Sequence, residues 1–178
     1  VTNNFLFLML GIGTIQFESF GTSRVFFNLL SDNAFLIICA IGMTFVILSG
    51  GIDLSVGAVI ALTGVVTSVL IAKFQWHPLA VFPVVLLGGT LFGSIMGAII
   101  HYYKIQPFIV TLAGMFLARG LASIISEESI PIEHEFYMAI ADAGFMLPGD
   151  AWVGVSTIIC LLVLVIAIIT AHFTRFGT

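Results

Sequence analysis

The sequence predicts an all-α membrane protein, built as a polytopic bundle of about six transmembrane helices. Charged residues make up 8% of the 178 residues and hydrophobic residues 60%, and the mean hydropathy is strongly positive. Soluble domains carry about a quarter charged residues, so this chain has too few charges to cover a surface in water. Its apolar runs are continuous, whereas the strands of an outer-membrane barrel alternate apolar and polar residues. Helices are therefore the expected spanning elements.

Six apolar runs are candidate membrane spans, and at about 20 residues per crossing the length allows little more. They cover residues 2–17, 34–48, 56–72, 79–100, 107–125 and 153–171. The second run is short for a full crossing at helical rise, unless it begins near Phe26. Pro107 opens the fifth run, a position where its missing N–H costs nothing.

Two polar segments separate these spans and suggest their orientation. Residues 18–33 are expected to form a polar connection, and residues 126–150 form the longest polar segment, with several acids and no Lys or Arg. Because Lys and Arg favour the cytoplasmic side, we expect 126–150 outside and 172–178 inside, together with Lys104. Counting back through six spans also places the N-terminus inside. A re-entrant turn at residues 50–53 would reverse that last assignment.

Residues 42–57 contain a break between two apolar runs, and the break carries a carboxylate, Asp53. Glycine pairs accept backbone angles that other residues resist, and an acid at membrane depth needs a partner, a cap or water. Two roles remain open: Asp53 caps the following helix, or the broken element lines a path whose half-helix N-terminus offers N–H groups to a polar solute. The break itself is either a loop at the membrane edge or an interruption at mid-membrane. The candidate path and gating residues are Gly50, Gly51, Asp53, Ser55, Gly57 and, from a later run, Arg119.

Arg119 is the second charge inside an apolar run, about 12 residues or roughly 18 Å beyond Pro107 at helical rise. Such an arginine pairs with an acid or a carbonyl, or faces a water-filled cavity. A structural ion pair, a contact between subunits and a solute contact are all compatible with this position. In the run before it, small residues recur every four positions and predict tight helix packing. They are Gly89, Gly93 and Gly97.

No residues in the sequence indicate catalysis or metal binding. Cys39 and Cys160 lie in apolar runs, where packing is their expected role, and one histidine between Glu133 and Glu135 is a weak metal signal. Hydrolase, metalloprotease and phosphate-loop motifs are absent from the sequence, so any ATP hydrolysis requires another subunit. An intramembrane enzyme that uses Asp53 or Arg119 is the alternative from another functional class, but no activated nucleophile supports it.

The segment Gly-Met-Thr-Phe-Val-Ile-Leu-Ser-Gly-Gly-Ile-Asp-Leu-Ser-Val-Gly at 42–57 resembles the signature of permease subunits of ABC-type carbohydrate importers, the ribose/xylose/galactose group. Residues 28–30, 107–115 with 118–120, and 174–177 resemble further motifs of that family, in the same order. Residues 126–132 resemble one of the galactofuranose permease subunits within it. The chain therefore resembles this family over most of its length.

This resemblance implies one transmembrane permease domain over residues 1–178, the N-terminal part of a longer chain whose ATPase-coupling segment would follow Thr178. It implies a path for a monosaccharide across the bacterial inner membrane. The expected partners are a second permease subunit (homo- or heterodimer), cytoplasmic ATPase subunits that hold the ATP, an external sugar-binding protein and the lipid bilayer. No cofactor, nucleic acid or enzymatic step is expected in this chain. Importers of branched-chain amino acids, which share a related architecture, are the alternative.

Overall fold

The computed structural model of the protein describes residues 2–17, 20, 22–147 and 151–173. Most of these residues are helical, and the one sheet among them has two strands. The elements in chain order are α1 (Thr2–Gln16), α2 (Ser23–Asp32), α3 (Ala34–Leu48), α4 (Val56–Ser68), the π-helix η1 (Val69–Lys73), α5 (Pro78–Tyr103), α6 (Pro107–Ile125), α7 (Glu135–Asp142), β1 (Gly144–Leu147), β2 (Ala151–Gly154) and α8 (Val155–Phe173).

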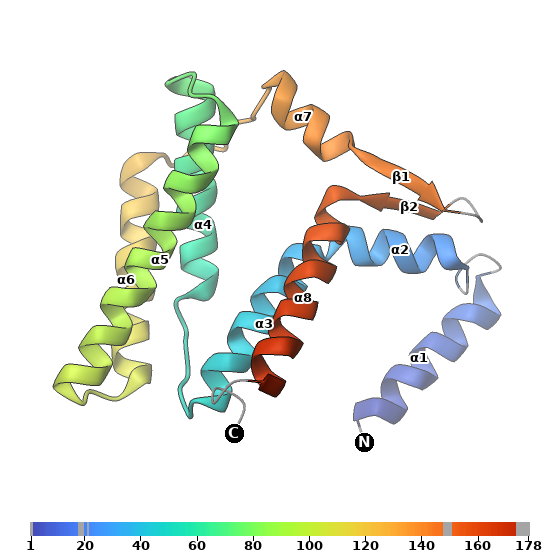
Figure 1. The fold of residues 1–178 in the computed structure, drawn as a ribbon, viewed down its shortest axis with the longest axis horizontal. Helices are drawn as coiled ribbons and strands as arrows, with labels where there is room; N and C mark the ends of the chain where they lie inside the picture. The colour runs from blue at the N-terminus through green and yellow to red at the C-terminus, as the bar shows by residue number, and fades with distance from the viewer. Residues whose placement is uncertain (1, 18–19, 21, 148–150, 174–178) are drawn as a thin grey trace.

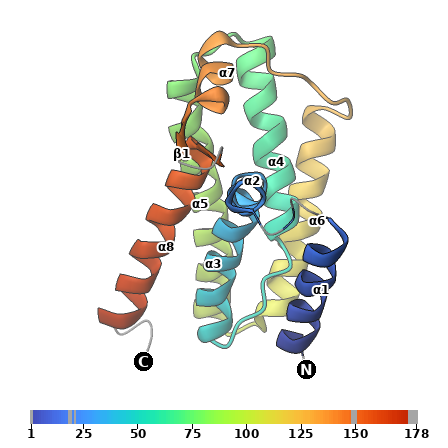
Figure 2. The same ribbon diagram turned by 90° about the vertical axis from the view of Figure 1, so that its right-hand side faces the viewer.

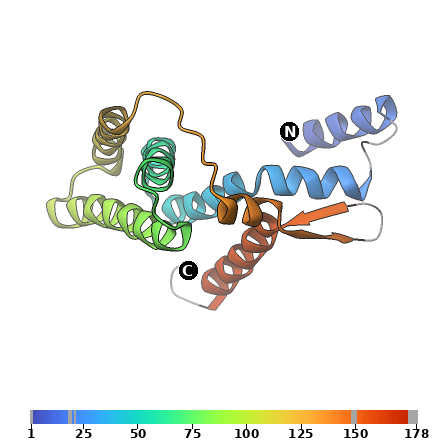
Figure 3. The ribbon, with the colours of Figure 1, turned by 90° about the horizontal axis from the view of Figure 1, so that it is seen from above.

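The helices form two groups. In Figure 1, α4, α5 and α6 stand together on one side, while α2, α3 and α8 lie with the β1–β2 hairpin on the other. Figure 3, which views the molecule from above, shows the same separation. Two connections join the groups: residues 49–55 at one end and the segment that leads into α7 at the other. Helix α1 stands apart from both groups in Figure 1, and in Figure 2, which views the molecule from that side, it lies in front of the lower part of α6.

The ends of the molecule are called lower and upper, as they appear in Figure 1. At the lower end α3 and α8 finish, and α5 turns into α6. At the upper end η1 turns into α5, and α7 crosses between the two groups. Lys104 therefore lies at the opposite end from α7, as the charge pattern predicts for the two sides of a membrane.

Four helical rods in the described part of the chain are long and apolar enough to cross a membrane. They are Val56–Lys73, Pro78–Tyr103, Pro107–Ile125 and Val155–Phe173. A fifth crossing is the pair Arg24–Asp32 and Ala34–Leu48, which is bent by 62° at its junction. The fold is thus the expected all-α polytopic bundle, with four or five spans of full length rather than about six. Helix α1, with 15 residues, is shorter than a full crossing.

Two segments expected to be connections contain secondary structure. Most of residues 18–33 form α2, whose Ser31 hydroxyl hydrogen-bonds to Thr157 at the buried start of α8. Residues 126–150 include α7 and strand β1, which pairs antiparallel with β2 in the register Gly144↔Gly154. These elements are short, with 10 residues in α2, eight in α7 and four in β1, so none of them gives the long apolar run that predicts a membrane span.

Candidate functional site

The break between α3 and α4 begins with a helix C-cap that requires glycine. Gly50 has φ +75°, and its N–H donates to the Ile47 carbonyl at 2.9 Å, while the Gly51 N–H donates to the Val46 carbonyl at 3.0 Å. These are the two bonds of a Schellman motif, with its left-handed residue at Gly50. A Cβ on Gly51 would lie 3.3 Å from the Val46 side chain, so this position is also tight. The glycine pair therefore ends α3 as the sequence suggests.

Asp53 organises the other end of the break. Its Oδ1 accepts hydrogen bonds from the Ser55 backbone N–H at 2.7 Å and from the Ser55 hydroxyl at 2.6 Å. Ser55 immediately precedes α4 and is almost fully buried. A carboxylate that bonds to the backbone two residues on forms an Asx-turn, so Asp53 fixes the chain just before the helix starts. Both bonds use Oδ1, and Oδ2 bonds to no other described residue.

A hydroxyl on α6 ties the break to the neighbouring helix. The Thr111 Oγ1 lies 3.1 Å from the Ile52 carbonyl and 2.9 Å from the Pro107 carbonyl, and Thr111 is buried. One hydroxyl proton serves only one of these acceptors at a time. Thr111 thus satisfies a backbone carbonyl in the non-helical segment, which would otherwise carry an unpaired polar group among apolar helices.

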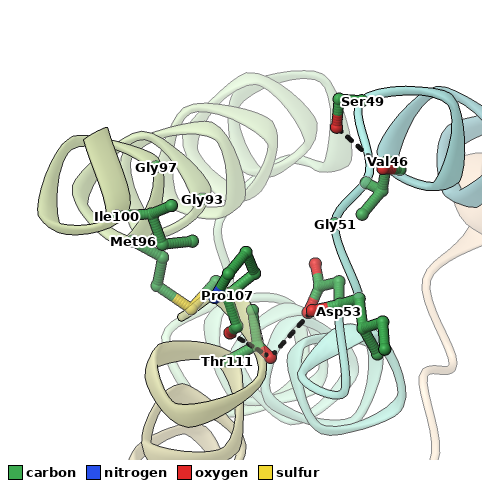
Figure 4. Close-up of a pocket in the computed structure, with 11 residues that line it drawn as sticks. Val46, Ser49, Gly51, Asp53, Gly93, Met96, Gly97, Ile100, Pro107 and Thr111 are labelled. Carbon is green, nitrogen blue, oxygen red and sulfur yellow. Dashed lines mark hydrogen bonds between the residues drawn. The ribbon is translucent and has the colours of Figure 1, made fainter. Parts of the chain in front are cut away.

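These residues border a pocket of about 330 Å³ in the lower half of the molecule. Asp53 faces it from the break, the glycines of α5 border it opposite, and Pro107 and Thr111 border it from α6 (Figure 4). Most of the lining is apolar, with Asp53, Ser49 and Thr111 as its polar side chains. An apolar pocket with a few convergent polar groups is the usual form of a small-molecule site. The lining residues are Val46, Ser49, Gly51, Ile52, Asp53, Gly93, Met96, Gly97, Ile100, Pro107 and Thr111.

The break lies at the level of intact helices rather than beyond them. Helix α4 begins well above the lower end of α5, and residues 49–55 rise beside the lower half of that helix (Figure 1). Non-helical backbone at this level is tolerated only where it is buried in protein or lines a cavity, and here it lines the pocket. The geometry is therefore that of a broken membrane element with a polar site at the break.

Comparison with protein families shows which family contains this arrangement. Residues 25–178 match the family described as "Branched-chain amino acid transport system / permease component". The chain belongs to this permease family. The match covers the break, α5, α6 and the whole pocket, so the site lies within the permease region.

Individual permeases are similar to the chain as well. It is 52% identical over 162 residues to the inner membrane ABC transporter permease protein YjfF of Escherichia coli K12, covering 91% of this chain and 49% of the relative. It is 40% identical over 177 residues to the fructose import permease protein FruG of Bifidobacterium longum, 96% of this chain and 52% of the relative. It is 36% identical over 149 residues to the galactofuranose transporter permease protein YtfT of Escherichia coli K12, 80% of this chain and 38% of the relative.

The chain therefore spans about half the length of the first two of these permeases. No solved structure matches it.

Arg119 lies away from the pocket of the permease. It is exposed on α6 and makes no hydrogen bond or ion pair with another described residue. The position is about eight residues beyond Thr111, or roughly 12 Å along the helix, and only about 9 Å from the upper end at Ile125. The structure thus separates the two intramembrane charges, and the ion pair or solute contact of Arg119 is not made within the described residues.

The three glycines of α5, at positions 89, 93 and 97, border hollows in the structure. Gly93 and Gly97 border the pocket, and Gly89 borders a second hollow between α4 and α5. A Cβ on any of the three would meet no atom within 4 Å in the described chain. The close helix contact that their spacing predicts is not formed among the described residues, and it stays a prediction. Gly57, in the first turn of α4, likewise has open space around it.

Sequence reasoning missed two features of the site. Thr111 and Met96 line the pocket, and a hydroxyl one turn into an apolar helix was the available signal for Thr111. At the upper end, the His134 ring contacts the His77 ring, and the described residues contain no group of three side chains that could hold a metal ion. The motif at 174–177 lies outside the described residues, as does most of the expected inner segment at 172–178.

Proposed function

We propose that this chain is part of the permease of an ATP-driven importer and that the pocket around Asp53 belongs to its path for a monosaccharide. The observation that carries the proposal is the broken element itself: a carboxylate whose Oδ2 bonds to no other described residue faces a pocket at the level of intact helices. Carboxylate, hydroxyl and carbonyl oxygens accept hydrogen bonds from sugar hydroxyls. The glycines opposite leave room for a solute against α5.

The sugar assignment is supported by two of the relatives, which are named as permeases for fructose and for galactofuranose. Galactofuranose is the narrower candidate, because residues 126–132 resemble that permease subunit. A branched-chain amino acid is the second candidate, favoured by the family description. The two classes differ in chemistry, since a zwitterion would need a cation for its carboxylate, and the described pocket lining contains none.

The proposed assembly places the chain in the bacterial inner membrane, with α7 and residues 126–150 outside and residues 172–178 inside. The pocket then lies in the cytoplasmic half of the membrane. A second permease subunit, cytoplasmic ATPase subunits and an external sugar-binding protein complete the importer, and ATP is bound and hydrolysed by the ATPase subunits alone. The chain itself catalyses no reaction and holds no cofactor.

The test uses the full-length permease reconstituted in liposomes with its ATPase and binding protein. We expect ATP-dependent uptake of one monosaccharide from a panel that includes galactofuranose, fructose and ribose, and no uptake of leucine. Leucine uptake without sugar uptake would favour the amino acid candidate. Failure of the full-length protein to associate with any ATPase, together with unchanged sugar uptake when it is deleted, would overturn the proposal. Labelling of the thiol in a Glu128→Cys variant in whole cells tests whether this loop lies outside.

A further inference from the structure

Two histidines that are remote from the Asp53 pocket meet at the upper end of the molecule. His77 lies just before α5 and His134 just before α7, and their imidazole centroids are 5.4 Å apart in an edge-to-face contact. The His77 ring also lies 4.9 Å from the Phe136 ring, and Phe82 lies 6.1 Å from Tyr137. These ring contacts join the start of α7 to the start of α5, two segments that are distant in sequence.

Both histidines are also helix N-caps. The His77 Nδ1 accepts the Leu79 backbone N–H at 3.3 Å, and the His134 Nδ1 accepts the Phe136 backbone N–H at 3.2 Å. An imidazole nitrogen accepts a hydrogen bond only when it carries no proton. Both bonds therefore require neutral rings, with the proton of each on Nε2.

Protonation opposes this arrangement in three ways. It places a proton on each Nδ1, so that a donor then faces the backbone donor of Leu79 or Phe136. It adds positive charge at the N-terminal end of a helix, where the dipole is already positive. It also brings two like charges to 5.4 Å between ring centres, a distance at which they repel.

The neighbouring charges are of both signs. Lys73 and Glu133 line a polar pocket of about 460 Å³ together with His134, and Glu135 is the first residue of α7. Two carboxylates and one ammonium group therefore lie near His134. The first turn of α5 carries no acid that would favour a charge on His77. Among the described residues, Tyr137 is a further titratable side chain in the α5–α7 contact, through its ring contact with Phe82.

We propose that His77 and His134 form a pH-sensitive contact that holds α7 and residues 130–134 against the turn at 74–77. Neutral imidazoles close the contact, and protonation releases it and opens the polar pocket between η1 and residues 130–134. Histidine is the side chain that ordinarily changes charge between pH 5 and 8. Because the released state binds more protons than the closed state, the stability of the contact falls as the pH falls. The inference goes beyond the proposed transport function and does not depend on it.

The test follows Trp76, the residue before His77, in the full-length protein in nanodiscs, with Trp152 and the remaining tryptophans replaced by Phe. We expect its emission to change in one transition between pH 8 and pH 5. His77→Asn and His134→Asn supply non-titrating caps, because Asn is a favoured N-cap. Each single variant should make the transition shallower, from about two protons toward one, and the double variant should abolish it. His101→Asn, at the lower end of α5, is the matched control and should leave it unchanged.

A second measurement keeps the result independent of the reporter. Hydrogen exchange is measured over Glu135–Asp142 and corrected for the intrinsic effect of pH, with Pro107–Ile125 as the internal reference. At pH 5.5 the exchange should accelerate in the wild type and not in the double variant. Equal thermal unfolding of wild type and double variant at pH 8 establishes that the variant is folded. A transition that persists in the double variant, or a wild type that shows neither change, would overturn the proposal.

Discussion

The two ends of the rod Val56–Lys73 are held by different chemistry. At the lower end, Asp53 bonds to Ser55 within the same short segment, and Thr111 adds one bond from α6. At the upper end, the turn into α5 is held by His77, whose partner ring belongs to a loop far along the chain. The bonds to Asp53 are short, local hydrogen bonds to an acid. The upper contacts are instead ring contacts and longer hydrogen bonds that two imidazoles accept from backbone N–H groups.

The site at Asp53 is therefore fixed by local hydrogen bonds, whereas the proposed contact between His77 and His134 changes with pH. The Asp53 Oδ1 holds the turn before α4 through two short hydrogen bonds from Ser55. Contacts between imidazoles depend on the protonation state of both rings. Under the two proposals above, the polar groups of the lower pocket stay in place while the upper contact opens and closes with pH.

The largest effect is expected at Asp53. Asp53→Ala removes two hydrogen bonds and the carboxylate that faces the pocket. We expect uptake by the full-length permease to fall at least about tenfold, or about 1.4 kcal/mol, while membrane insertion stays intact. Asp53→Asn separates the two roles, because Asn also forms Asx-turns and so keeps the turn while it removes the carboxylate. We expect this variant to keep the thermal stability of the wild type and to lose uptake. Wild-type uptake in the Ala variant would leave Asp53 only its role in the turn.

Arg119 tests whether the upper half of α6 contributes to the site or to assembly. Its guanidinium has no partner in the described chain and lies well above the pocket. A charge at this level needs a partner or access to the interface, so we expect Arg119→Ala to reduce the amount of assembled importer about fivefold, the effect of about 1 kcal/mol. Substrate preference should not change. Blue-native electrophoresis and a competition assay measure the two quantities, and the reverse pattern would make Arg119 a path residue.

The fold class and the break were predictable from the sequence because they rest on composition and on local chemistry. Continuous apolar runs dictate spanning helices, and the pair Gly50-Gly51 followed by Asp53 specifies a C-cap and a turn within a few residues. Of the six candidate path residues, Gly50, Gly51, Asp53 and Ser55 lie at the break. Gly93 and Gly97, which were expected to pack against a helix, border the pocket.

The remaining features depend on contacts between distant segments. Nothing near Thr111 in sequence indicates that its hydroxyl reaches Ile52, and nothing near His134 indicates His77. Periodicity likewise placed Arg119 inside a helix but could not give its rotation or height relative to Asp53. Hydropathy predicted about six membrane segments, whereas the described residues contain four helices of full length and the pair α2 and α3, which meets at a 62° bend that hydropathy does not detect. The 15 residues of α1 are shorter than a full crossing.

A pair of glycine variants tests whether the lower end is held by backbone geometry. Gly50 has φ +75° and any other residue there is strained, whereas Gly57 is helical with open space around it. We expect Gly50→Ala to lower the free energy of unfolding by roughly 1 kcal/mol and Gly57→Ala to raise it by about 0.5–1 kcal/mol. Thermal unfolding in detergent compares the two. Equal stability of both variants would contradict the Schellman turn at Gly50.

The smallest expected effect concerns the single bond between the break and α6. Thr111→Val keeps the shape of the buried side chain and removes the hydroxyl that reaches the Ile52 and Pro107 carbonyls. We expect a loss of about 0.5–1 kcal/mol in stability, the usual net value of one hydrogen bond. Thr111→Ser keeps the hydroxyl and is the control. If the Val variant matches the Ser variant in both unfolding and uptake, the break is held by Asp53 and the glycine turn alone. A larger uptake loss in Val than in Ser would mean that α6 positions the break for its solute.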